Sequence, residues 1–138
     1  MKMIQGLIAG ALLNLAAMTG VMAADGNALS VHVLNLQDGL PSTGLNVELD
    51  RLVDGQWQNI NKGVTDDQGR ISALYPSDKA IEQGNYRVVF KTGEWFGARK
   101  AATFFPEVPV IFSVDGSLPH YHIPLLLSPY GYSTYRGN

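Results

Sequence analysis

The sequence predicts an all-β domain, a two-sheet β-sandwich of seven or eight strands with one short helix. Polar and apolar residues alternate along several short segments, which is typical of strands that bury one face. Clusters of glycine, proline, aspartate and asparagine interrupt these segments at regular intervals. One segment alone has apolar residues at helical spacing. Short strands with frequent turns and little helix indicate a β-sandwich.

The first strand is expected at residues 29–34. Leucine and valine occupy its odd positions, so its even positions, His32 among them, lie on the opposite face from the valines. Turn-forming residues at 38–44 end this strand. The alternation therefore places one of the three histidines on the face that does not join the valine core.

The next two strands are expected to form a hairpin. Residues 45–52 alternate in the same way, and the Asp54-Gly55 turn signal predicts a return strand that starts at Trp57. The remaining strands are expected at residues 70–74, 86–91, 108–114, 120–127 and 132–136.

Two local features lie between these strands. The turn at 65–69 places Arg70 where a turn enters a strand. A helix is expected at 94–102, where tryptophan and alanine recur at helical spacing; Gly97 weakens it and Pro106 prevents its extension.

The first 23 residues have the pattern of a cleavable secretory signal peptide. A basic residue, Lys2, precedes an apolar stretch that ends in a small-x-small motif, which predicts cleavage after Ala23. A transmembrane anchor would need about 20 nearly unbroken apolar residues, and Asn14 interrupts this stretch. We therefore expect export to the periplasm and one mature domain at 24–138, with no membrane attachment after the signal is removed.

Composition narrows the chemistry of the mature domain. The chain has no cysteine, which excludes a thiol nucleophile and a zinc-thiolate site. Its formal net charge of −2, without a basic cluster, gives no indication of nucleic-acid binding. Nucleophile-elbow, phosphate-loop and HExxH motifs are absent from the sequence. The partner expected from composition is a small molecule or another copy of the chain.

The candidate chemical groups are histidines and one arginine. His120 and His122 are two apart on a strand, so they share one face while Tyr121 points the other way. With His32 as a third donor they could bind a metal, but no carboxylate adjoins them. A general-base role and a structural or incidental role also stay open, and Arg70 alone could be a surface residue after a turn.

The C-terminal segment HYHIPLLLSPYGYSTYRG, at 120–137, resembles the signature of the 5-hydroxyisourate hydrolase family, which is related to transthyretin. The resemblance covers essentially the whole mature chain. Further matching segments are residues 29–35, 67–70, 84–93 and 105–110.

This resemblance implies a transthyretin-like sandwich that assembles as a homotetramer, with active sites in the channel between dimers. The implied reaction, a step of urate degradation, hydrolyses the lactam ring of 5-hydroxyisourate to 2-oxo-4-hydroxy-4-carboxy-5-ureidoimidazoline. It implies no metal and no cofactor. Residues 24–138 would then form a transthyretin-like hydrolase domain.

The resemblance also assigns residues. One histidine would deprotonate the attacking water and the arginine would hold substrate oxygens, with either His32 or His122 as the base. His120 is left with a supporting role, and Asn138 replaces the serine that usually ends the family's sequences. The implied catalytic residues are His32, Arg70 and His122, and the implied substrate-binding residues are His32, Arg70, Tyr135, Arg136 and Gly137.

Two functions of other classes remain as alternatives. One is a periplasmic carrier that binds a small aromatic ligand in a transthyretin-like channel without turnover, and the other is a purely structural sandwich. Transthyretin, a hormone carrier, has a similar fold but lacks the two catalytic histidines and the Tyr-Arg-Gly end. The combination of His32, Arg70 and His122 in this chain therefore favours the enzyme.

Overall fold

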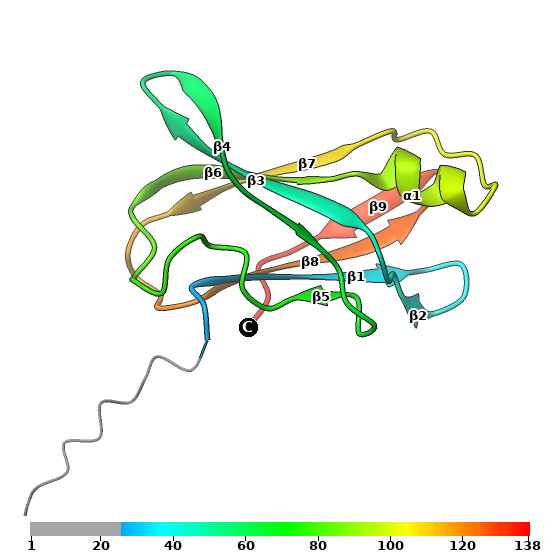
Figure 1. Cartoon of the computed structure of the whole chain (residues 1–138), viewed down its shortest axis with the longest axis horizontal. Coiled ribbons are helices and arrows are strands. Elements are labelled where there is room, and N and C mark those ends of the chain that lie inside the picture. Colours follow the sequence, from blue (N-terminus) through cyan, green and yellow to red (C-terminus); the bar gives the residue numbers. More distant parts are fainter. Residues whose placement is uncertain (1–25) are drawn as a thin grey trace, which may run out of the picture.

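The computed structural model describes residues 26–138, which form a two-layer β-sandwich (Figure 1). Within this range there are nine strands and one helix, and two of the strands have only two residues. The predicted fold class is confirmed. The elements are β1 (Leu29–Asn35), β2 (Leu40–Pro41), β3 (Asn46–Val53), β4 (Gln56–Val64), β5 (Arg70–Ile71), β6 (Gly84–Phe90), α1 (Thr92–Ala98), β7 (Val108–Val114), β8 (Tyr121–Ser128) and β9 (Gly131–Thr134).

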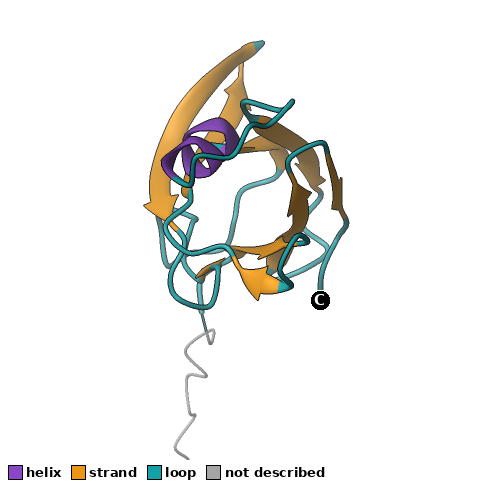
Figure 2. Ribbon diagram, turned by 90° about the vertical axis from the view of Figure 1, so that its right-hand side faces the viewer, coloured by secondary structure: helices purple, strands orange, loops and turns teal. Residues whose placement is uncertain are grey.

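The two sheets face each other, as the end-on view in Figure 2 shows. One has the order β2-β1-β8-β9, with the short β5 also paired to β1; the other has the order β4-β3-β6-β7. Strands β1 and β8 run parallel, whereas the remaining described pairs are antiparallel. The parallel pair joins the beginning of the domain to its end, so residues about ninety positions apart lie side by side.

Strand alternation determines which side chains enter the core. Leu29, Val31 and Val33 on β1 are fully buried, while the residues between them are half-buried on the other face. This arrangement confirms the predicted separation of His32 from the valines. Fully or almost fully buried residues that pack with them include Leu45, Val47, Leu49, Leu74, Tyr86, Val88, Phe90, Leu125 and Leu127.

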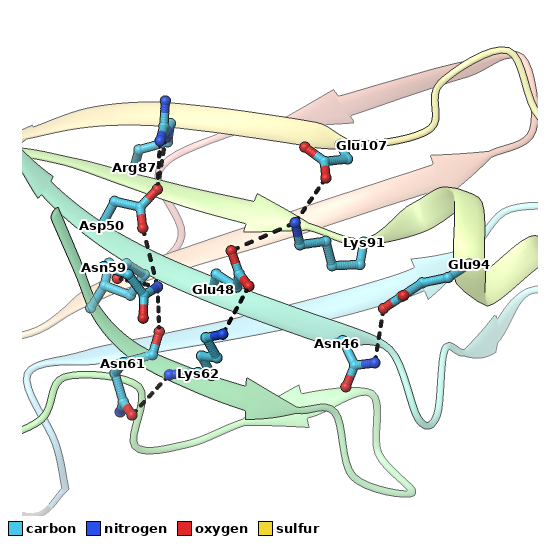
Figure 3. A network of polar contacts seen from close by, with 11 residues as sticks. Asn46, Glu48, Asp50, Asn59, Asn61, Lys62, Arg87, Lys91, Glu94 and Glu107 are labelled. Carbon is cyan, nitrogen blue, oxygen red and sulfur yellow. Dashed lines mark hydrogen bonds and ion pairs between the residues drawn. The ribbon is translucent and has the colours of Figure 1, made fainter. Parts of the chain in front are cut away.

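The outer face of the second sheet carries a layer of paired polar groups (Figure 3). Its most buried member is Asp50, whose side chain is only 7% exposed. Arg87 donates to Asp50 Oδ2 from Nε at 2.9 Å and from Nη2 at 2.7 Å, and Asn59 donates to Oδ1 at 3.1 Å. The Arg87 guanidinium also lies 4.6 Å from the centre of the Trp57 ring. These contacts satisfy a carboxylate that would be costly to bury alone.

The hairpin and the helix test two local predictions. Strands β3 and β4 pair through the Asp54-Gly55 turn, as predicted. The helix was expected at 94–102 but spans Thr92–Ala98. It ends early because Lys100 adopts a left-handed conformation with φ of 57°. In this conformation the backbone leaves the helix axis, and the next amide, at 101, bonds back to the Phe96 carbonyl at 3.0 Å.

Two predicted strands are shorter than expected. The strand expected at 70–74 is paired only at Arg70–Ile71, and the one expected at 132–136 ends at Thr134. Tyr135 and Arg136 therefore lie beyond the sheet. In contrast, the segment expected to be only a turn at 38–44 contains the two-residue strand β2.

The predicted signal peptide at 1–23, its cleavage site and the start of the mature domain at 24 lie outside the described residues. Within residues 26–138, no helix has the length and apolar character needed to cross a membrane.

Because Asp50 is buried, its ion pair with Arg87 should contribute more to the free energy of unfolding than the exposed pair of Lys62 with Glu48. Changing Arg87 to Met should lower the free energy of unfolding by about 3 kcal/mol, because it leaves a buried carboxylate without its cation. Lys62 is 69% exposed and lies 3.5 Å from Glu48 Oε1. The control Lys62→Met should therefore cost less than about 1 kcal/mol. Urea unfolding at one protein concentration checks both values, and equal losses would contradict the assignment.

Candidate active site

Three of the predicted site residues lie on the face of the first sheet that points away from the core. The antiparallel pairing of β1 with β5 sets His32 opposite Arg70. The parallel pairing of β1 with β8 sets Ser30 opposite His122 and His32 opposite Pro124. Residues opposite each other on paired strands share a face, so both histidines and the arginine converge on one surface. Three strands from distant parts of the sequence thus build one cluster.

The turn before Arg70 is fixed by Asp66. Its Oδ1 accepts hydrogen bonds from the backbone N–H of Gln68 at 2.8 Å and of Arg70 at 2.9 Å. Gly69 has φ of 69°, and a Cβ placed there would lie 2.5 Å from the Val33 carbonyl oxygen. Only glycine meets both conditions. The Gly69 carbonyl in turn accepts from the Val33 N–H at 2.8 Å, which fastens Arg70 to β1.

His122 belongs to a hydrogen-bonded chain with Ser30 and His120. Ser30 Oγ lies 2.7 Å from His122 Nδ1 and 2.9 Å from His120 Nε2. His120 Nδ1 lies 2.6 Å from the Asn27 carbonyl oxygen. The two imidazole rings stack with centroids 6.5 Å apart, which confirms that they share a face. Ser30 was not among the residues predicted for the site, although its position two residues before His32 placed it on the same face.

Burial and a neighbouring cation keep both site histidines neutral near pH 7. Burial is the main cause that lowers the pKa of His32 below 6.5, and the Arg70 charge lowers it further. Two smaller effects raise the pKa of His32: hydrogen bonding with the main chain of Gln68, and the negative charge of Asp66. For His122 the pKa is also lowered mainly by burial, then by Arg70 and by the other two histidines. Neutral imidazoles with an available lone pair are suited to accept a proton.

The C-terminal peptide lies against His122. After β9 the chain turns back toward β1 and β5, where it ends (Figure 1). The Gly137 N–H donates to the His122 carbonyl at 2.9 Å, and a Cβ on Gly137 would lie 2.5 Å from His122 Cδ2. The position therefore requires a residue without a side chain. Of the terminal tripeptide, Gly137 is the residue that the structure places on the histidine ring.

Tyr135 and Arg136 lie at the edge of the sandwich, beyond the end of β9. They border a cavity of about 270 Å³ at the edge of the sandwich, together with β7 residues such as Ile111 and Phe112. A larger cavity, about 590 Å³, lies on the other sheet and is lined by Glu48, Lys62, Lys91 and other polar residues. Within residues 26–138 no three His, Asp or Glu side chains are grouped so as to hold a metal ion.

The sequences of known proteins match this chain over almost its whole described length. The model of the HIUase/Transthyretin family matches residues 29–137. A protein of Salmonella typhimurium named 5-hydroxyisourate hydrolase is 52% identical over 123 residues, which cover 89% of this chain and 90% of that protein. A mouse protein of the same name is 36% identical over 119 residues, covering 85% of this chain and all of that protein.

Solved structures show the same fold. The 5-hydroxyisourate hydrolase of Klebsiella pneumoniae superposes with a TM-score of 0.70 at 33% identity, covering 80% of this chain and 98% of the other. Sea bream transthyretin in complex with thyroxine superposes with a TM-score of 0.74 at 30% identity, covering 80% and 94%. The fold therefore occurs both in a hydrolase and in a thyroxine-binding protein. From the family match and these identities, the chain belongs to the HIUase/transthyretin family.

Proposed function

We propose that the protein hydrolyses 5-hydroxyisourate to 2-oxo-4-hydroxy-4-carboxy-5-ureidoimidazoline. Water adds to the lactam carbonyl carbon while a neutral histidine takes a proton from it. The ring C–N bond then breaks, the nitrogen receives a proton, and the carbonyl carbon becomes a carboxylic acid. His32 or His122 serves as the base, and Arg70 holds the substrate oxygens and stabilises the developing negative charge.

The observation that carries this proposal is the convergence of His32, Arg70 and His122 on one face. Lactam hydrolysis needs a base that is unprotonated near pH 7 and a cation near the developing oxyanion. The lowered pKa of both histidines supplies the unprotonated base. Arg70, held by its fixed turn, supplies the cation. The hydrolases of Salmonella typhimurium and mouse are relatives of this chain and carry the name of the same reaction.

The alternative function is a carrier of a small aromatic ligand. The sea bream transthyretin structure, which holds thyroxine, has the same fold and supports this alternative. A carrier channel is lined mainly by apolar groups, whereas this face presents two histidines and an arginine. Turnover of 5-hydroxyisourate distinguishes the two functions, because a carrier would bind the compound and leave its decay unchanged.

Assembly and location belong to the same proposal. We infer a homotetramer with sites between dimers, supported by the edge strands β7 and β9, which end their sheets in the described part of the chain. Paired edges would also avoid the aggregation that exposed strands promote. In such an assembly the cavity beside these edges, which Tyr135 and Arg136 line, would lie near the neighbouring subunit. The periplasmic location stays an expectation from the leader at 1–23.

The central experiment follows the ultraviolet decay of 5-hydroxyisourate that uricase generates from urate. The wild-type protein should accelerate the decay, and a His32→Ala, His122→Ala double variant should lose about 10²- to 10⁴-fold of that acceleration. Circular dichroism of the double variant confirms that it folds. Equal acceleration by both proteins, or none by the wild type, would refute the proposed function.

The pH dependence provides a second prediction. Because burial and Arg70 lower the pKa of both histidines, the acid limb of kcat/KM should lie below pH 6.5. Arg70→Gln removes the cation that lowers these pKa values, so its limb should move to higher pH, in addition to a loss of rate. Arg70→Lys retains the charge and serves as the control. If the acid limbs of the wild type and of Arg70→Gln lay at the same pH, Arg70 would not be lowering the pKa of the catalytic histidine.

The close approach of Gly137 to His122 gives a third prediction. Gly137→Ala should lower kcat roughly 10–100-fold, because the added methyl group must displace the His122 ring or the C-terminal peptide. The matched control is Gly97→Ala, since a Cβ at Gly97 meets nothing within 4 Å. Steady-state kinetics should show wild-type kcat for the control. Wild-type kcat for Gly137→Ala as well would mean that the terminal peptide does not position the ring.

A further inference from the structure

We infer that Ser30 is a positioning residue that holds His122 in the tautomer able to act as the base, with His120 at the far end of the same hydrogen-bonded chain. This inference rests on the proposed function and deepens it, because it assigns the proton-accepting atom to Nε2 of His122. Ser30 would not contact the substrate. It would act through the His122 ring.

The direction of each hydrogen bond follows from the fixed end of the chain. A carbonyl oxygen can only accept, so His120 Nδ1, at 2.6 Å from the Asn27 oxygen, must carry a proton. Nε2 of a neutral His120 is then an acceptor, and Ser30 Oγ, at 2.9 Å, donates to it. A serine hydroxyl has one proton. Toward His122 Nδ1, at 2.7 Å, Ser30 can therefore only accept.

The result is a neutral His122 with its proton on Nδ1 and its lone pair on Nε2. No hydrogen bond from residues 26–138 reaches that Nε2, so it is available to a water molecule. When Nε2 takes a proton from the attacking water, the ring becomes a cation and its bond to Ser30 becomes charge-assisted and stronger. Ser30 keeps its own proton throughout. The bridge thus favours the protonated ring as the reaction proceeds.

The far end of the chain is anchored well enough to set these directions. The Asn27 side chain donates to the Tyr75 carbonyl at 2.6 Å and accepts from the Tyr75 N–H at 2.8 Å. It also accepts from the Leu29 N–H at 3.1 Å at the start of β1. These bonds fix the backbone segment whose carbonyl receives the His120 proton. His32 takes no part in this chain of hydrogen bonds, which leaves it to orient the water or to protonate the leaving nitrogen.

The first test is spectroscopic and does not depend on activity. Long-range ¹H–¹⁵N spectra of the full protein labelled in histidine, at about pH 8, report the tautomer of each neutral ring. The chain has three histidines, so His32→Phe and His122→Phe suffice to assign the signals. The wild type should have the His122 proton on Nδ1, and Ser30→Ala should populate the Nε2–H form. A His122 proton on Nε2 in the wild type, or spectra unchanged by Ser30→Ala, would overturn the inference.

The second test is kinetic. Ser30→Ala should lower kcat about tenfold, the rate equivalent of one hydrogen bond, with KM nearly unchanged. Ser30→Thr retains the hydroxyl on a strand position and should restore most of kcat, and equal thermal midpoints would show that both variants fold. Wild-type kcat in Ser30→Ala, or a loss that Ser30→Thr does not restore, would overturn the positioning role. If the wild type showed no hydrolysis, the proposed function would fail, while the spectra would still decide whether Ser30 sets the tautomer.

Discussion

The site depends on the register of one parallel strand pair, β1 with β8. In this register Leu29 and Val31 enter the core while Ser30 meets His122 on the opposite face. A slip of β1 by one residue would move its valines to solvent and His32 into the core, so core burial and site geometry are enforced together. Burying one apolar side chain is worth about 1.5–3 kcal/mol, and several line this pair. The hydrophobic core therefore holds the polar site in place.

Much of this arrangement follows from local patterns in the sequence. Period-two alternation correctly separates His32 from the valines and places His120 and His122 on one face. Alternation alone does not reveal which strands pair. The contact between Ser30 and His122 joins positions 92 residues apart, so no local pattern indicates it. The C-terminal segment shows the same limit: it alternates like a strand, but β9 ends at Thr134 and the chain beyond it meets His122.

The positive charge of Arg70 affects both histidines of the site. Arg70 lies beside His32 and lowers the pKa of both His32 and His122, so one cation serves two purposes. In the proposed mechanism it also stabilises negative charge on the substrate while it keeps the two imidazoles unprotonated. Asp66 fixes the turn through backbone hydrogen bonds and offsets part of this lowering at His32. Half-burial of the histidines has the same effect as the cation, because it disfavours the imidazolium form.

The proposed function requires that His32 and His122 act as one catalytic unit on the outer face of the β1–β8 pair. A double-mutant cycle on kcat/KM tests it most directly, with His32→Ala, His122→Ala and the double variant measured under the same conditions. Residues of one catalytic unit give strongly non-additive losses. We expect the double variant to lose little more activity than the less active of the two single variants. Losses that multiply would contradict it, since they would mean that the two histidines act independently.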